Sequence, residues 1–275
     1  MSRFVIYMIA YVVMVVVNII AERLPLNGQT TGEISRKVDV LFTPAGYVFS
    51  IWGLIYILLA IWILRQVPFS RRDLPMYRQA LVPFVISCIL NALWIVVWHY
   101  EYFFFSVIVM LSLLFTLISL YTVVKRTNPR FFDLLPFSIY LSWISVATIA
   151  NISFTLKYNG WDGFGLSDAF WAIVMLLIAT ALAFLFMIRQ RDNIYPLVFV
   201  WAFVGIGVKN QGTASLVAYV SFLLAGVILI GTASLYKEKH NRPYLPMGDL
   251  YILTYCFMKF FCISSSCKSF LKFCF

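Results

Sequence analysis

Three apolar segments of the chain each carry aromatic or amide side chains at intervals of three, four, seven or eight residues. These intervals place the members of each set on one face of a helix. An amide in hydrocarbon is costly unless it finds a hydrogen-bond partner, so such faces are expected to point inward. Together they predict one cavity for a flat, mostly apolar ligand. The sets are Phe49, Trp52 and Tyr56; Asn91, Trp94 and Trp98; and Trp143, Ala147 and Asn151.

Trp98 lies near a predicted helix end, beside Tyr100 and Tyr102. Aromatic side chains gather at membrane interfaces because their rings are amphipathic. We therefore interpret Trp98 as an interfacial anchor. The other eight residues of the three sets form the candidate ligand-binding group.

The composition requires a membrane protein. Of the 275 residues, 63% are hydrophobic and only 12% are charged, a balance that no soluble domain of this size could solvate. The apolar runs are continuous rather than alternating, which excludes an outer-membrane barrel. Runs of about 20 residues recur, as crossing a hydrocarbon core of about 30 Å requires. The sequence thus predicts an all-α polytopic membrane protein in contact with the lipid bilayer.

Eight spans are predicted, and the first is interpreted as a retained span rather than a signal peptide, because no small-residue cleavage site follows it. The seventh is short, and it is expected to be tilted, re-entrant or shielded by its neighbours. The spans are Phe4–Ile20, Tyr47–Leu64, Ala80–Trp98, Phe103–Val124, Leu135–Phe154, Ala169–Ile188, Pro196–Val208 and Leu216–Tyr236.

The net charge of +10 follows from Lys and Arg in short loops between apolar runs, so it indicates membrane orientation and not nucleic-acid binding. If all eight spans cross, thirteen of these cations fall on the side of the N-terminus and five on the other. Both termini are therefore predicted to be cytoplasmic, in the cell membrane. The five cations are Arg23, Arg36, Lys37, Lys157 and Lys209.

Two segments outside the spans leave alternatives open. Residues 21–46 form the longest loop between spans, rich in Gly and Pro, and loops of this length are either functional lids or plain surface loops. Residues 237–275 form a tail that is either an interfacial or palmitoylated anchor or a disordered extension without a role.

Ordinary catalytic chemistry is missing from the sequence. No acidic residue lies well inside a predicted span, and no Ser/His/Asp set, phosphate loop or HExxH pattern occurs. The five cysteines and two histidines have no metal-site spacing. We therefore expect no enzyme activity, no metal and no required cofactor.

Three stretches carry a family resemblance. Residues 42–56 (FTPAGYVFSIWGLIY) resemble the second-helix entry of the TspO/MBR family of tryptophan-rich sensory and translocator proteins. Residues 90–94 (LNALW) and 140–151 (YLSWISVATIAN) are similar to its third-helix and fifth-helix motifs. The stretches occur in the family's order, and the resemblance covers residues 1–155.

The resemblance implies a TspO-like five-helix bundle over residues 1–155. The apolar runs beyond it predict about three additional transmembrane helices over 156–236. It also implies a receptor or carrier for porphyrin, haem or a similar flat hydrophobic ligand, with a sensory or transport-linked role. By motif match, Trp52, Asn91, Trp94, Trp143 and Ala147 would line or support the pocket. Whether the protein forms a homodimer is left open.

Two alternative functions stay open. The three additional helices could complete the path of a small-solute transporter, although no ionisable residue inside a span favours it. The second alternative is a membrane enzyme that degrades porphyrin. Two departures from the family weaken it. Phe42 and Tyr47 stand where the family has tryptophans, and one residue is missing between Phe49 and Trp52 relative to the family spacing.

The predicted topology is testable with reporter fusions. Because Lys and Arg are retained in the cytoplasm, fusions after residues 70, 128 and 240 should read cytoplasmic, and fusions near residues 30 and 160 should read external. An external reading after residue 240 would contradict the even number of spans.

Overall fold

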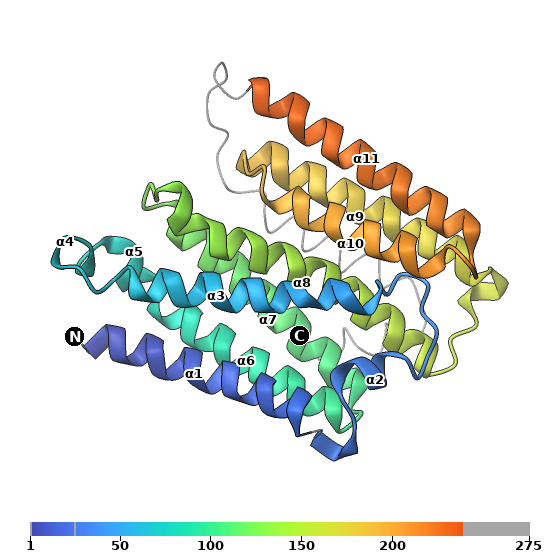
Figure 1. Ribbon diagram of the computed structural model, residues 1–275, viewed down its shortest axis with the longest axis horizontal. Coiled ribbons are helices and arrows are strands. Elements are labelled where there is room, and N and C mark those ends of the chain that lie inside the picture. Colours follow the sequence, from blue (N-terminus) through green and yellow to red (C-terminus); the bar gives the residue numbers. More distant parts are fainter. Residues whose placement is uncertain (1, 25, 239–275) are drawn as a thin grey trace, which may run out of the picture.

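The computed structural model describes residues 2–24 and 26–238, and the tail from residue 239 onward lies outside the described residues. Eight long helices form a bundle in the described part (Figure 1). They are α1 (Ser2–Arg23), α3 (Ile51–Leu64), α6 (Leu81–His99), α7 (Phe103–Lys125), α8 (Phe131–Tyr158), α9 (Asp168–Gln190), α10 (Tyr195–Asn210) and α11 (Ser215–Glu238). Short elements connect them: α2 (Thr31–Ser35), α4 (Phe69–Arg72), α5 (Pro75–Gln79) and the 3-10 turns η1 (Leu26–Gly28), η2 (Gly46–Ser50) and η3 (Gly163–Gly165).

Seven of these helices are long and apolar enough to cross a membrane, with η2 and α3 counted together. The remaining helix, α10, corresponds to the seventh predicted span, and its 16 apolar residues rise only about 24 Å at 1.5 Å per residue. Asp192, just before α10, accepts a hydrogen bond from Tyr121 near the end of α7, at 2.8 Å. Lys209, at its other end, donates to the loop that follows α1. The short helix therefore still runs from one end of the bundle to the other.

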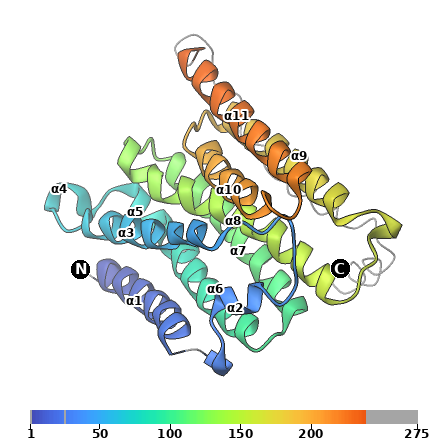
Figure 2. The same cartoon turned by 45° about the vertical axis from the view of Figure 1, so that its right-hand side comes forward.

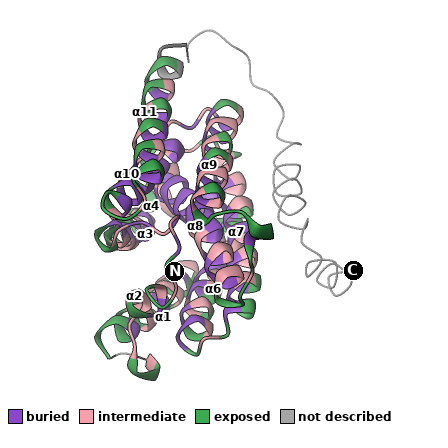
Figure 3. Ribbon diagram, turned by 90° about the vertical axis from the view of Figure 1, so that its right-hand side faces the viewer, coloured by how far each residue is buried: buried purple, intermediate pink, exposed green. Residues whose placement is uncertain are grey.

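Helix α8 lies at the centre, with α3, α7 and α10 packed around it. Nearly every position of α8 from Pro136 to Ile149 is buried, whereas the outer helices bury one face only (Figure 3). Their other faces expose aliphatic side chains such as Ile9, Val82 and Ile230. An apolar exterior around a packed interior is what a lipid environment requires.

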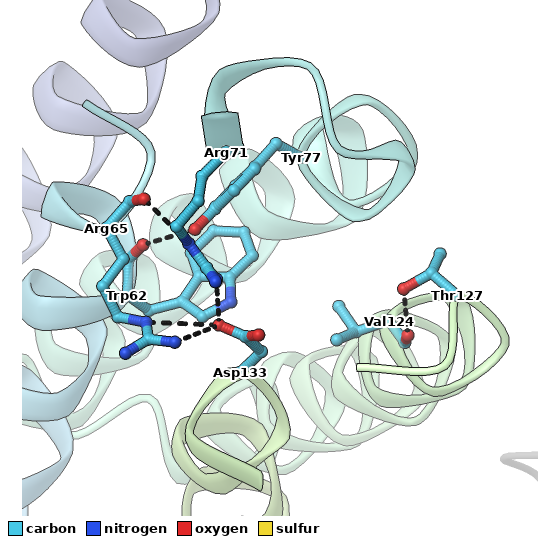
Figure 4. A network of polar contacts seen from close by, with 7 residues as sticks. All are labelled: Trp62, Arg65, Arg71, Tyr77, Val124, Thr127 and Asp133. Carbon is cyan, nitrogen blue, oxygen red and sulfur yellow. Dashed lines mark hydrogen bonds and ion pairs between the residues drawn. The ribbon is translucent and has the colours of Figure 1, made fainter. Parts of the chain in front are cut away.

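A buried carboxylate joins α8 to α3 and α4 at one end of the bundle (Figure 4). Asp133 lies in the first turn of α8 with its side chain 3% exposed. Arg65 donates to it from Nε and Nη2 at 3.2 and 3.1 Å, and Arg71 donates from Nη2. Arg71 also donates to the Arg65 carbonyl at 3.1 Å. One carboxylate thus holds two guanidinium groups that would otherwise repel each other.

Aromatic rings pack directly beside this carboxylate. The Trp62 ring lies 4.9 Å from Phe137 and 4.7 Å from Tyr77, measured between centroids, and Tyr7 lies 5.4 Å from Trp62. The pairs of Trp62 with Phe137 and with Tyr7 are edge-to-face, and such pairs contribute about 0.5–1.5 kcal/mol beyond area burial. The cluster therefore fixes α1, α3, α5 and α8 against one another at this end.

The opposite end of the bundle is crossed by residues 26–45, which we call the lid segment (Figure 1). A capping box between Thr30 and Glu33 begins its short helix α2, and the hydrogen bonds from Thr30 lower the pKa of Glu33. Glu101, between α6 and α7, pairs with Lys37 and accepts from Gln29 at 3.2 Å, and these bonds lower its pKa. This half of the lid segment is therefore fastened to the α6–α7 connection.

The other half of the lid segment is fastened to α10. Lys209 donates to the Val40 carbonyl at 3.0 Å and Asn210 to the Leu41 carbonyl at 2.9 Å. The Gly205 carbonyl accepts from the Ala45 backbone N–H at 3.1 Å. A helix that the family resemblance places outside the five-helix unit therefore holds the lid segment in place.

Asp133→Asn should lower the free energy of unfolding by on the order of 3 kcal/mol, because two partly buried guanidinium groups lose their shared charge partner. A thermal melt of the detergent-solubilised protein measures the loss as a lower midpoint. Asp73→Asn is the matched control, since Asp73 pairs with Arg3 at 2.9 Å but is 79% exposed, and such pairs contribute about 0–1 kcal/mol. Equal losses in the two variants would refute a special role for Asp133.

Gly205→Ala should loosen the lid segment. A Cβ at this position would lie 2.1 Å from Val48 Cγ2 in η2 and 3.3 Å from Pro44 Cβ in the lid segment, so η2 and the adjoining end of the lid segment must move away from α10. Faster protease cleavage or hydrogen exchange within residues 36–46 would report the movement. Gly226→Ala in α11 is the control, because a Cβ there meets nothing within 4 Å. Unchanged cleavage in the Gly205 variant would contradict the expectation.

Candidate functional site

A cavity of about 1020 Å³ lies beneath the lid segment. Helix α1 supplies Asn18 and Ile19 to its wall, and α6 supplies Trp94 and Ile95. The remaining wall comes from η2 and α3, from the lid segment and from Lys209 of α10. Figure 2 shows α1, α3 and α6 with the lid segment at one end of them.

Four of the eight predicted binding residues line this cavity: Phe49, Trp52, Tyr56 and Trp94. The spacing of Phe49, Trp52 and Tyr56 explains why they do so together, because the three share one face of the η2–α3 segment. The Trp52 and Tyr56 rings stack with centroids 5.7 Å apart and an angle of 24°. Aromatic faces thus form the apolar side of the site.

Trp143 lies behind this wall rather than in it. Its side chain is 2% exposed, and its ring packs edge-on against Phe49 at 5.8 Å and Trp52 at 6.3 Å. Central helix α8 thereby supports the two rings that face the cavity. Trp143 therefore positions the wall and does not contact the cavity directly.

Asn91 also lies one layer back, in a chain of hydrogen bonds. Asn18, which lines the cavity, donates to Asn91 Oδ1 at 2.8 Å, and Asn91 Nδ2 donates to the Tyr140 hydroxyl at 2.9 Å. The chain joins α1, α6 and α8 inside the apolar interior, where unpaired amides would be costly. Asn18 and Tyr140 are the hydrogen-bond partners that the sequence predicts Asn91 to need.

Ala147 and Asn151 are not part of the cavity wall. Asn151 exchanges hydrogen bonds with Ser106 of α7, at 3.1 and 3.2 Å, so its amide serves the contact between α7 and α8. Ala147 is half-buried and packs against the core. Of the three predicted residues on α8, Trp143 thus supports the cavity wall, whereas Ala147 and Asn151 pack the bundle.

Trp98 differs from its interpretation as an interfacial anchor. The structure buries it to 4% exposure, stacked on Trp94 at 5.3 Å and in contact with Phe103 and Phe154. Its Nε1 donates to the Thr31 carbonyl of the lid segment at 3.4 Å. Trp98 does lie near the helix end, as the sequence predicts, but the lid segment and α7 cover its ring.

Three polar atoms of the cavity residues are buried without a hydrogen-bond partner among the described residues: Thr31 Oγ1, the Tyr56 hydroxyl and Trp94 Nε1. Buried polar groups in native structures are normally paired, so each unpaired one needs an explanation. Because these atoms have almost no accessible surface, they lie inside the packed wall of the cavity and not on its open face.

Charged residues surround the opening of the cavity. Glu22 and Arg23 end α1, Arg36 and Asp39 belong to the lid segment, and all four are exposed. Lys209 pairs with Asp39, Nζ to Oδ1, at 3.2 Å. The site therefore has an aromatic interior and an ionic mouth.

Sequence reasoning missed the contributions of α1, the lid segment and α10. Asn18 is an amide within an otherwise apolar run, the same signal that drew attention to Asn91, and it could have been found. The charge count places Arg23, Arg36 and Lys209 on the same side of the membrane but assigns them to no site. No local pattern reveals that these residues meet, because they come from three separate parts of the chain.

The chain matches the TSPO-like protein family over residues 4–234, which includes all three motif stretches and extends across α9, α10 and most of α11. No curated protein matches, and no solved structure matches. The match covers well over half of the chain and agrees with an apolar helical bundle with seven candidate spans. The chain is an integral membrane protein that belongs to the TSPO-like protein family.

Proposed function

We propose that the chain is a membrane receptor or carrier that holds a flat, mostly apolar ligand of the tetrapyrrole type, porphyrin or haem, in the cavity under the lid segment. The observation that carries the proposal is the wall of Phe49, Trp52, Tyr56 and Trp94 around about 1020 Å³. Pockets for small ligands usually measure about 300–1,000 Å³. This cavity lies at the upper end of that range and suits a macrocycle better than a small solute.

The wall matches the chemistry of such a ligand. Indole and phenol rings offer broad apolar contact at a low cost in side-chain entropy, and they stack on other flat rings. Phe49 and Trp52 are backed by Trp143, so they do not have to be ordered when a ligand binds.

The lid segment supports binding with controlled access. It borders the cavity and is fastened on both sides by ion pairs and hydrogen bonds whose side chains are at least partly exposed. Such contacts are weak enough to open and re-form. With both termini in the cytoplasm, as the charge bias predicts, the mouth of the cavity would face outward.

Trp52→Leu and Trp94→Leu should each weaken protoporphyrin binding about tenfold, or roughly 1.4 kcal/mol, because leucine keeps the helix apolar but removes the ring from the wall. Absorbance titration of the purified protein with protoporphyrin and with haem measures the effect. Trp143→Leu should weaken binding less, because its ring only supports Phe49 and Trp52.

Trp161→Leu is the control for these variants. Trp161 packs against Trp171 at 5.0 Å and lines a separate cavity of about 100 Å³, too small for a macrocycle. Its replacement should leave binding unchanged. If the Trp52 and Trp94 variants bind like the parent protein, the cavity is not the binding site and the proposal fails.

A further inference from the structure

A second, smaller cavity of about 100 Å³ lies where the lid segment meets the end of α8 and the beginning of α9. It shares no lining residue with the larger cavity. Because α8 and α9 are candidate membrane spans, the cavity at their ends lies at the depth of the lipid headgroups. An apolar cavity of about 150 Å³ holds benzene, so this one suits a group of about five heavy atoms.

Two tryptophans line this cavity side by side. The rings of Trp161, in the loop after α8, and Trp171 of α9 are half-buried, with centroids 5.0 Å apart and an angle of 56°. Trp171 Nε1 donates to the Gly163 carbonyl at 2.9 Å, and Gly163 has a φ of +63°. A Cβ on Gly163 would lie 3.0 Å from Nε1, so the loop closes tightly around this ring. Indole faces attract cations more strongly than other aromatic side chains do.

The charges in the wall also favour a cation. Lys157 pairs with Asp168 and donates to the Asp39 carbonyl at 2.8 Å. Asp162 forms no ion pair within the described residues, and its Oδ1 accepts from the Phe164 backbone N–H at 3.0 Å. Two carboxylates and one ammonium therefore line the cavity, which leaves an excess of one negative charge.

We infer that this second cavity binds a quaternary ammonium group, the methylated cation of choline and of phosphatidylcholine. Its charge lies near Asp162 and the indoles of Trp161 and Trp171, and its methyl groups pack against aliphatic surface that includes Leu156 and Met175. Aromatic side chains recognise quaternary ammonium groups in this way, because the positive charge is spread over methyl groups that need no hydrogen bonds.

Other small ligands suit the same wall less well. An anion would meet two carboxylates, and a primary ammonium would exchange its water for a mostly apolar wall with few acceptors. A neutral apolar group would gain nothing from the charge of Asp162 or from the quadrupole of the indoles. The combination of apolar surface, indoles and negative charge thus selects a small cation with an apolar surface.

The test compares choline with dimethylbutanol, its uncharged isostere in which carbon replaces nitrogen. The full-length protein in maltoside micelles is titrated with each probe by calorimetry. The parent protein should bind choline about tenfold more tightly than dimethylbutanol. Equal affinities would show that the cavity does not recognise the positive charge, and they would overturn the inference.

Asp162→Asn should lose about tenfold in affinity for choline and keep its affinity for dimethylbutanol. The asparagine still offers an oxygen to the Phe164 N–H, so the loop keeps its hydrogen bond. Asp73→Asn is the matched control, because it changes the net charge equally at an exposed position that pairs with Arg3. Equal losses in both variants would show general electrostatic attraction and refute a site at Asp162.

Trp161→Leu removes one indole and should weaken choline binding about fivefold. Its affinity for protoporphyrin should stay unchanged, since the two cavities share no lining residue. Choline binding equal to that of the parent protein would refute the role of the indoles. The outcome is independent of the proposed function, because a failure of porphyrin binding would not alter it.

A titration in phosphatidylcholine nanodiscs identifies the source of the ammonium group. If the lipid headgroup occupies the cavity, it competes, and the affinity for free choline should fall at least about tenfold relative to maltoside micelles. If the affinity is the same in both, the cavity takes a free quaternary ammonium compound. Either result supports the site, whereas choline binding to neither preparation would overturn it.

Discussion

The hydrogen-bond chain of Asn18, Asn91 and Tyr140 is the contact on which the site depends. It joins α1, α6 and α8 in a mostly apolar interior. Hydrophobic contact does not distinguish one helix from another in lipid, whereas a buried amide accepts only a few partners. These hydrogen bonds therefore set which faces of α1, α6 and α8 meet. The position of the cavity wall follows from that arrangement.

The site is built in layers around this chain. Trp143 of the central helix backs Phe49 and Trp52, and these rings in turn face the cavity. At the far end, Asp133 holds Arg65 and Arg71 beside an aromatic cluster, which keeps the connection after α3 in place. The rigid parts of the molecule thus lie below the cavity, and the weaker contacts lie in the lid segment above it.

Helix α10 connects the last three helices to the site. Lys209, Asn210 and Gly205 hold the lid segment, and Lys209 also lines the cavity. The family match across residues 4–234 agrees with a unit that includes these helices. The division at residue 155 stays a prediction, but the contacts show that α10, which lies beyond that residue, holds the lid segment and lines the cavity.

The sequence by itself determined the helical membrane class, the family and the inward direction of the aromatic faces. These follow from composition and from the helical repeat, which act over a few turns of one helix. It selected Phe49, Trp52, Tyr56 and Trp94, and the structure places all four along the cavity. An inward face meets either a cavity or another helix, and its local spacing is the same in both cases.

Tertiary structure decided whether each inward face meets the cavity or another helix. Asn151 pairs with Ser106, Trp143 backs the wall, and Trp98 is covered by the lid segment. Only the packing of α1, the lid segment and α10 around α3 and α6 brings Asn18, Arg36 and Lys209 to one cavity. Contacts between residues far apart in the chain depend on the placement of whole helices, and no interval in the sequence records that placement.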